Sequence, residues 1–187
     1  MKILFTYALD AEKGEIIIPG IKTAFCCTGV GKVQAALAAY DAILEEKPDL
    51  VVNIGSAGTL NHNVGDILLC ARFIDRDLEK VGIPGIVYEL DFFYELSKTG
   101  FLMGCSINNT VSTGDSFVTD RAGAGPGADV VDMEAFGMAQ ACKKCHLPFI
   151  SIKYVTDIIG QNSVKTWTDK LSDARIGLSA FIGTLKF

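Results

Sequence analysis

The chain has 187 residues, of which 49% are hydrophobic and 21% are charged, and its formal net charge is −5. This composition excludes an intrinsically disordered protein, which would be poor in aliphatic residues and rich in charge. The sequence has no apolar run near the roughly 20 residues that cross a bilayer and no basic run suited to a nucleic-acid backbone. We therefore expect one soluble domain spanning residues 1–187, with neither a membrane nor a nucleic acid as partner.

The N-terminal residues do not have the pattern of a secretory signal peptide. Asp10 arrives before an apolar segment could be completed, and no small-residue cleavage site follows. We therefore expect a cytoplasmic protein whose six cysteines are free thiols in a reducing environment.

The first quarter of the chain combines strand and helix patterns. A buried strand is predicted at Lys2–Tyr7, and the apolar segments on either side of Pro19-Gly20 predict a hairpin or two edge strands. A helix is predicted from Lys32 to Pro48. Its apolar residues recur at spacings of four, three and four, and we expect them to face the core: Val33, Leu37, Tyr40 and Leu44.

Strands and helices continue to alternate after Pro48. Further strands are predicted at residues 50–55, 66–73, 101–106, 110–114 and 148–155, and helices after Val130 and from Ser163 onward. Residues 74–100 give no clear pattern. The alternation indicates an α/β fold of three layers, with a mostly parallel central sheet flanked by helices.

Two short motifs could suggest other functions. The segment Cys142–His146 matches the pattern of c-type haem attachment, but without an export signal we interpret its cysteines as core residues one helical turn apart. The segment Thr28–Lys32 lies between a strand and a helix but lacks the Walker and dinucleotide-binding glycine patterns. It is either a tight turn or a backbone site for an anion or hydroxyl.

Three acidic residues follow predicted strands, where ligands bind in open α/β sheets. Glu12 could instead be a solvated helix start, and Asp157 could simply cap the segment that follows it. Glu134 is harder to explain without a function, because apolar residues surround it and an unpartnered buried carboxylate is costly. Ser56 and Phe117 follow two other strands and are expected at the same edge.

Several segments together resemble a known superfamily. They are GVGKVQAALAAYDAI, PDLVVNIGSAGTL, VGDILL, TGDSFV, VVDMEAFGMAQAC and PFISIKYVTD, and they occur in the family's order. They resemble the purine nucleoside phosphorylase and nucleosidase superfamily, and within it most strongly the 5′-methylthioadenosine/S-adenosylhomocysteine nucleosidases. The resemblance implies a nucleoside phosphorylase-like fold, here abbreviated around residues 13–27 and poorly matched over residues 73–100.

The resemblance also implies roles for the three acids. Asp157 would protonate N7 of the purine, Glu12 would activate the attacking water, and Glu134 would hold the ribose hydroxyls. This division suits the chemistry, because cleavage through an oxocarbenium ion needs one protonated and one ionised carboxyl group. The remaining substrate contacts implied by the resemblance are Met133 under the sugar, Ser56 at the water site, Phe117 stacked on the base, the backbone of Val118 at the base edge, and Ala8.

The expected activity is hydrolysis of the N-ribosidic bond of a purine nucleoside, with a 5′-substituted adenosine from methionine salvage as substrate. We expect no cofactor and no metal, and the resemblance implies a homodimer. The family's phosphorylases carry an arginine where this chain has Asn53-Ile54, which favours water as the acceptor. The alternatives are a phosphate-dependent phosphorylase, a futalosine-type hydrolase of the same fold, or a nucleoside-binding protein that has lost turnover.

Overall fold

The computed structural model describes residues 1–100, 104–125, 127–161 and 163–187. A mixed sheet lies at its centre in the order β2-β1-β3-β7-β6-β4-β5, and β8 pairs with both β3 and β4. Five of the eight strand pairings are parallel, so the predicted mostly parallel sheet is confirmed. The strands are β1 Lys2–Tyr7, β2 Lys22–Cys27, β3 Leu50–Thr59, β4 Ile67–Asp75, β5 Glu89–Asp91, β6 Asn109–Thr113, β7 Val130–Asp132 and β8 Phe149–Ile158.

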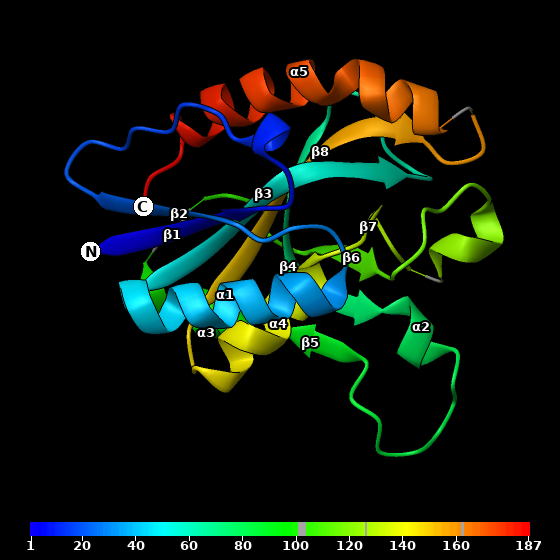
Figure 1. Cartoon of the computed structure of the whole chain (residues 1–187), viewed down its shortest axis with the longest axis horizontal. Helices are drawn as coiled ribbons and strands as arrows, with labels where there is room; N and C mark the ends of the chain where they lie inside the picture. Colours follow the sequence, from blue (N-terminus) through cyan, green and yellow to red (C-terminus); the bar gives the residue numbers. More distant parts are fainter. Residues whose placement is uncertain (101–103, 126, 162) are drawn as a thin grey trace.

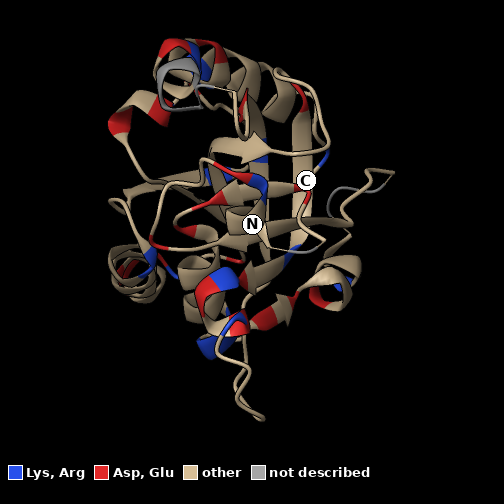
Figure 2. Ribbon diagram, turned by 90° about the vertical axis from the view of Figure 1, so that its right-hand side faces the viewer, with Lys and Arg blue, Asp and Glu red and all other residues tan. Residues whose placement is uncertain are grey.

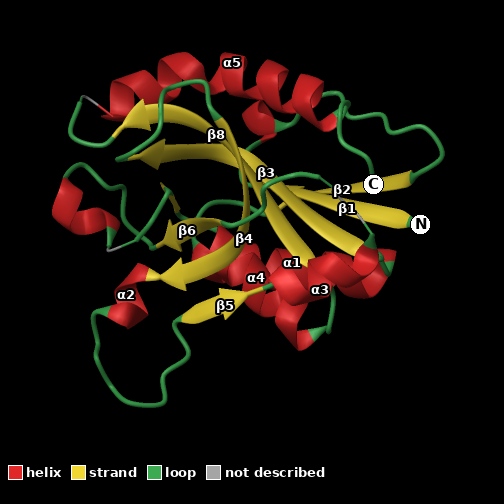
Figure 3. Cartoon of the chain, turned by 180° about the vertical axis from the view of Figure 1, so that it is seen from behind, coloured by secondary structure: helices red, strands yellow, loops and turns green. Residues whose placement is uncertain are grey.

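Helices cover the sheet on both faces, as predicted for three layers (Figures 1 and 3). One face carries α5, and the other carries α1, α3 and α4. The helices are α1 Lys32–Glu46, α2 Arg76–Glu79, α3 Phe93–Thr99, α4 Ala135–Lys144 and α5 Ser163–Ile182, with two 3₁₀ turns, η1 Asp10–Glu12 and η2 Arg121–Ala124.

The strand pairings close a ring at one end of the sheet. β3 pairs with β8 and β7, β4 pairs with β8 and β6, and β6 pairs with β7. Inside the core, the rings of Phe73, Phe92 and Phe149 meet with centroids 4.8 to 6.0 Å apart. Such tilted and edge-on aromatic pairs add to the apolar burial that holds the sheet to α3 and α4.

Of the hairpin or two edge strands predicted on either side of Pro19-Gly20, only the second strand is present, as the edge strand β2. Residues 15–18 form no strand, and β2 pairs parallel to β1 in the register Lys2↔Lys22. A parallel pair cannot be joined by a tight turn, so the chain leaves η1 and returns in a long loop to begin β2 at the sheet edge (Figure 1). The strand predicted from residue 101 also fails over its described part, since residues 104–106 are not strand; residues 101–103 lie outside the described residues.

Helix α1 is present as predicted, but its inward face is not the predicted one. Its buried residues are Ala35, Ala39 and Ile43, whereas most of the predicted face is exposed: Val33 70%, Leu37 63% and Leu44 54%. The physical reason is the close approach of α4, because a Cβ added at Gly137 would overlap the carbonyl oxygen of Lys32. Small residues therefore pack at this helix crossing, and the larger apolar side chains point outward.

The remaining sequence-level expectations concern cysteines and charge. All six cysteines are free, and in the CKKCH segment Cys142 is buried in the core whereas Cys145, just after α4, is half-buried against it. Among the described residues, no helix combines the length and hydropathy needed to cross a bilayer. Lys and Arg positions alternate with Asp and Glu positions along the described ribbon, without a continuous basic track (Figure 2).

Candidate active site

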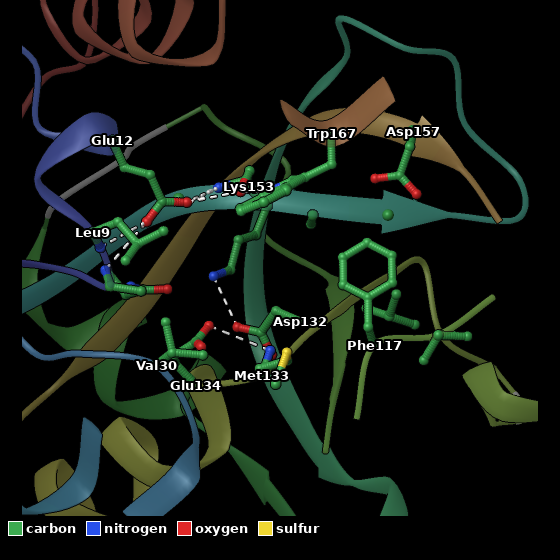
Figure 4. Close-up of a pocket in the computed structure, with 18 of the residues that line it drawn as sticks. Leu9, Glu12, Val30, Phe117, Asp132, Met133, Glu134, Lys153, Asp157 and Trp167 are labelled. Carbon is green, nitrogen blue, oxygen red and sulfur yellow. Dashed lines mark hydrogen bonds and ion pairs between the residues drawn. The ribbon is translucent and has the colours of Figure 1, made fainter. Parts of the chain in front are cut away.

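A pocket of about 790 Å³, including its open mouth, lies at the carboxyl ends of β1, β6 and β7. All eight residues that the sequence singled out line it, so the fold brings them together (Figure 4). They are Ala8, Glu12, Ser56, Phe117, Val118, Met133, Glu134 and Asp157.

Glu12 ends the 3₁₀ turn that follows β1, and its side chain turns into the pocket with only 4% of the residue exposed. Its Oε1 accepts hydrogen bonds from the backbone N of Ser56 at 2.9 Å and from the Ser56 hydroxyl at 2.7 Å. Its Oε2 accepts from the backbone N–H groups of Ala8 and Leu9 at 3.2 and 3.3 Å. Four donors therefore fix the orientation of this carboxylate, and the reading of Glu12 as a solvated helix start is wrong.

Asp157 reaches the pocket because of an irregularity in the sheet. The pairing of β3 with β8 shifts between Ala57 and Gly58, so that Gly58 faces Asp157. Such a bulge re-aims a side chain. A Cβ at Gly58 would lie 3.0 Å from Asp157 Oδ2, so the glycine leaves room for the carboxyl group. Asp157 is 2% exposed, and the Thr156 hydroxyl donates to its Oδ1 at 3.0 Å.

Ser56 and Asp157 both lie within strands rather than beyond their ends, contrary to the predicted bounds of these strands. β3 continues to Thr59 and β8 to Ile158, because the two strands pair with each other over almost their whole length. Gly55, on the same stretch of β3, gives space to Glu12, whose Oε1 would lie 3.3 Å from an added Cβ. The NIGSAG segment is thus the wall of the pocket between the two acids.

Glu134 is the N-cap residue of α4, two residues after the end of β7, and is 9% exposed. Its Oε1 accepts a hydrogen bond from the backbone N of Gly31 at 3.1 Å. Gly31 has φ +95°, a conformation that favours glycine. Burial, followed by repulsion from Asp132, raises the pKa of Glu134 from 4.5 to about 7.

The glycine-rich segment Thr28–Lys32 therefore does bind anions, but they belong to the protein itself. The amide of Gly31 holds Glu134, and the amide of Lys32 donates to Asp115 Oδ1 at 2.9 Å. The Lys32 ammonium adds ion pairs of 2.8 Å to both Asp75 and Asp77. The N-terminus of α1 is thereby tied to the loops around the pocket.

A buried ion pair lies between the two sides of the pocket. Lys153, on β8, contacts Asp132 Oδ2 at 2.8 Å, and the side chains are 2% and 1% exposed. Burial alone would lower the pKa of Lys153, but the attraction of Asp132, Glu134 and Glu12 outweighs it and raises that pKa. Asp132 is held in turn by the Thr113 hydroxyl at 2.6 Å and the amide of Ala135 at 2.9 Å.

Aromatic side chains line the end of the pocket near Asp157 (Figure 4). Phe117 is 41% exposed and meets the Trp167 ring edge-on at 6.3 Å between centroids. Trp167, from α5, also donates its indole N–H to the Ser56 hydroxyl at 2.9 Å. A planar ring entering here would have an aromatic face beside it and a carboxyl group at its edge.

The charged or tryptophan side chains of the pocket that sequence reasoning missed are Arg76, Asp132, Lys153 and Trp167. For Lys153 a signal existed, because it is a lone charge inside the apolar segment PFISIKYV. Trp167 lies in the helix predicted from Ser163 onward, where no motif marks it as a site residue. Arg76 lies in the stretch that gave no clear pattern.

Known proteins are similar to this chain in sequence and in fold. The family model described as the phosphorylase superfamily matches residues 9–99 and 108–182. A 5′-methylthioadenosine/S-adenosylhomocysteine nucleosidase from Bacillus velezensis is 30% identical over 178 residues, covering 84% of this chain and 77% of the relative.

Solved structures of such nucleosidases have a similar fold. The corresponding nucleosidase from Colwellia psychrerythraea, in complex with adenine, has a TM-score of 0.79 and 26% identity, covering 100% of this chain and 96% of that one. The enzyme from Neisseria meningitidis, in complex with methylthio-immucillin-A, has a TM-score of 0.79 over 97% of this chain and 96% of that chain, and at 22% identity it supports the fold alone. The fold is that of a nucleoside phosphorylase-like enzyme. The chain belongs to the phosphorylase superfamily and, within it, to the 5′-methylthioadenosine/S-adenosylhomocysteine nucleosidases, which are N-ribosyl hydrolases.

Proposed function

We propose that this protein hydrolyses the N-ribosidic bond of a 5′-substituted adenosine, such as methylthioadenosine or S-adenosylhomocysteine, and releases adenine. The observation that carries the proposal is the convergence of three buried acids, Glu12, Glu134 and Asp157, on one pocket. Two of them have the environment that opposite roles require, since Glu12 accepts four hydrogen bonds while Asp157 lies at the aromatic end.

In this proposal Asp157 is the general acid. A purine stacked on Phe117, with its edge at the backbone of Val118, would bring N7 to the Asp157 carboxyl group. Protonation there removes the negative charge that builds up on the base as the bond to ribose breaks. General acid catalysis of this kind contributes about 10² to 10⁴ in rate.

Glu12 and Glu134 act on the ribose side. Glu12, fixed by its four donors, would accept a proton from the attacking water, and Ser56 lies beside it at the water site. Glu134 would accept hydrogen bonds from the ribose hydroxyls, with Met133 under the sugar. Both carboxylates also stabilise the positive charge of the oxocarbenium-like transition state.

The charges of the pocket favour water over phosphate as the acceptor. Among the described residues that line it, four are acidic, Glu12, Asp132, Glu134 and Asp157, and two are basic, Arg76 and Lys153. The four terminal N–H groups of Arg76 all donate to backbone carbonyls, and Lys153 pairs with Asp132. A phosphate dianion would therefore meet a net negative site whose cations are already engaged.

The 5′ substituent would lie near the apolar side chains of Leu9 and Val30, next to the ribose-binding Glu134 (Figure 4). An apolar wall favours a thioether over a free hydroxyl group, because it offers the hydroxyl no partner. This supports a role in methionine salvage. The free thiols, including exposed Cys27, fit a cytoplasmic enzyme.

We also propose that the protein is a homodimer. The outward face of α1 carries Val33, Leu37 and Leu44, which are 54% to 70% exposed. Val30, 44% exposed, precedes this stripe in the chain and lines the pocket. A second copy packed on the stripe would cover apolar area that a monomer leaves in water.

The direct test is base release from adenosine, methylthioadenosine, S-adenosylhomocysteine and inosine, each with and without phosphate. We expect phosphate-independent release of adenine, fastest from the 5′-thio substrates. Asp157→Asn and Glu12→Gln should each lower kcat by about 10² to 10⁴, while exposed Asp173→Asn on α5 should leave it unchanged. Release that requires phosphate would establish a phosphorylase, and binding of adenine without release from any nucleoside would establish the binding-protein alternative.

A further inference from the structure

Arg76 is the largest fully buried side chain among the described residues, with 1% of the residue exposed. It begins the short helix α2 directly after β4. The hydrogen bonds of its guanidinium group go to four backbone carbonyls rather than to a carboxylate. They are those of Ser112 at 2.7 Å and Asp132 at 2.9 Å from Nη1, and Gly114 at 3.1 Å and Ser116 at 2.5 Å from Nη2.

These four carbonyls belong to two segments that separate at this point. β6 and β7 pair up to Thr113↔Asp132, and one further backbone bond, from Gly114 N to Asp132 O, ends the ladder. Beyond it, one segment runs on to Phe117 and Val118 and the other to Met133 and Glu134. Arg76 thus bonds to both segments at the end of the ladder, through Ser112 and Asp132, and continues along the first segment beyond it to Gly114 and Ser116.

The local sequence is adapted to the guanidinium group. A Cβ at Gly114 would lie 2.6 Å from Arg76 Nε and 2.7 Å from Cζ, so only glycine leaves room for it. β7 has only three residues, so few backbone hydrogen bonds join it to β6. A planar fork of fixed geometry is well suited to set the distance between two strands.

We propose that Arg76 is a positioning residue, which holds the base-stacking segment 114–118 at a fixed distance from the ribose-binding segment 132–134. It determines whether one nucleoside can place its purine on Phe117 and its ribose on Glu134 at the same time. This inference rests on the proposed function for the identity of the ligand.

The test compares a ligand that occupies one segment with a ligand that spans both. Trp167 is the only tryptophan of the chain and lines the pocket, so its fluorescence reports binding. Adenine probes the base segment alone, and methylthio-immucillin-A probes both. The variant is Arg76→Lys, which keeps the charge and the stem but removes the fork. The matched control is Arg72→Gln, since Arg72 lies on β4, just before Arg76 in the chain, in an exposed pair with Glu89.

We expect Arg76→Lys to weaken binding of the spanning ligand, and to lower kcat/KM for methylthioadenosine, on the order of 100-fold, the loss that a displacement of about 1 Å can cause. Adenine affinity should change about threefold or less, and Arg72→Gln should match the wild type. An equal loss for adenine and the spanning ligand, or a wild-type-like Arg76→Lys, would overturn the proposal.

A second variant covers the case in which Arg76→Lys does not fold. Gly114→Ala keeps Arg76 but displaces its guanidinium group, and the same preferential loss of the spanning ligand is expected. The binding comparison does not depend on turnover. If the wild type binds both ligands but releases no adenine from nucleosides, the proposed function fails while the role of Arg76 is still decided.

Discussion

At the scale of single residues, Glu134 gives the pocket a pH dependence. Its pKa of about 7, raised by burial and by Asp132, means that the carboxyl group is mostly protonated below pH 7 in the free protein. A protonated Glu134 loses acceptor capacity for the ribose hydroxyls. We therefore expect kcat/KM for methylthioadenosine to fall about tenfold per pH unit below pH 7.

A pH profile of kcat/KM from pH 5.5 to 9 measures this fall, the acidic limb of the profile. In Glu134→Gln the limb should disappear together with most of the activity, because glutamine does not titrate. Adenine, which leaves the ribose segment empty, should bind wild-type protein with little change over the same range. A limb that persists in Glu134→Gln would show that another group titrates.

The same raised pKa predicts an effect on stability. The folded protein binds the proton on Glu134 more tightly than the unfolded chain does, so this contribution to stability is present below pH 4.5 and is lost as the pH rises through about 7. At 1.36 kcal/mol per pKa unit, the loss reaches about 3 kcal/mol. Glu134→Gln should therefore be more stable relative to wild type at pH 8 than at pH 5, as measured by urea unfolding. Exposed Glu15→Gln is the control, and an equal difference at both pH values would contradict the expectation.

The acidic residues of the site could be predicted from the sequence, but the directions of their side chains could not. Glu12, Glu134 and Asp157 could be found because acids after strands are informative. The bulge that turns Asp157 inward depends on the pairing of β3 with β8, which are about 100 residues apart in the chain and carry no local signal of register. Arg76 could not be found, because its partners are backbone carbonyl groups. Every residue has one, so no sequence pattern marks these partners.

At the scale of elements, α5 is more than a cover for the sheet. Its Trp167 donates to Ser56, and Ser56 donates to Glu12, so a helix late in the chain supports an acid near its beginning. Trp167→Phe keeps an aromatic ring beside Phe117 but removes the N–H donor. A net hydrogen bond is worth about 0.5 to 1.5 kcal/mol, so kcat/KM should fall about 2- to 13-fold.

A double-variant cycle tests whether this loss runs through Ser56. Ser56→Ala removes the link directly, and the pair Trp167→Phe/Ser56→Ala should then be no worse than Ser56→Ala alone. Adenine affinity, measured by calorimetry, should stay within about twofold in Trp167→Phe. Additive losses would indicate that Trp167 acts by contact with the substrate instead.

The crossing of α1 and α4 depends on one glycine. A Cβ at Gly137 would overlap the Lys32 carbonyl oxygen and lie 3.0 Å from its carbonyl carbon, and neither atom can move without shifting α1. Gly137→Ala should therefore lower the free energy of unfolding by about 1 to 3 kcal/mol, despite the better helix propensity of alanine. Gln140→Ala, exposed on the same helix, should change it by less than about 0.5 kcal/mol. Denaturant unfolding of both variants measures these free energies. A Gly137→Ala variant more stable than wild type would contradict the close approach of the two helices.

The same crossing explains why the face of α1 was mispredicted while its existence was not. Length, period and the stop at Pro48 define a helix locally. Hydrophobic periodicity assumes that the largest apolar residues face the core, and here the tight approach of α4 reserves that side for Ala35 and Ala39. An apolar stripe remains on the outside.

At the scale of the whole molecule, that stripe is where we place the interface of the proposed homodimer. The outer faces of α1 and α5 differ, because α1 exposes Val33, Leu37 and Leu44 along one line, whereas Ile176 of α5, 63% exposed, has charged Asp173 and Arg175 beside it in the chain. α1 and α5 also lie on opposite faces of the sheet (Figure 1). An association through apolar side chains would therefore use the α1 face.

We predict that Leu37→Glu dissociates the proposed homodimer. A carboxylate at the centre of the stripe would be buried without a partner on association, a cost of several kcal/mol against an apolar contact. Light scattering after size exclusion at micromolar concentration should give twice the chain mass for wild type and for the control Ile176→Glu, and the chain mass for Leu37→Glu. Circular dichroism should be the same for all three, since Leu37 is exposed in the single chain. A monomeric wild type, or a Leu37→Glu variant that remains dimeric, would place the interface elsewhere or remove it.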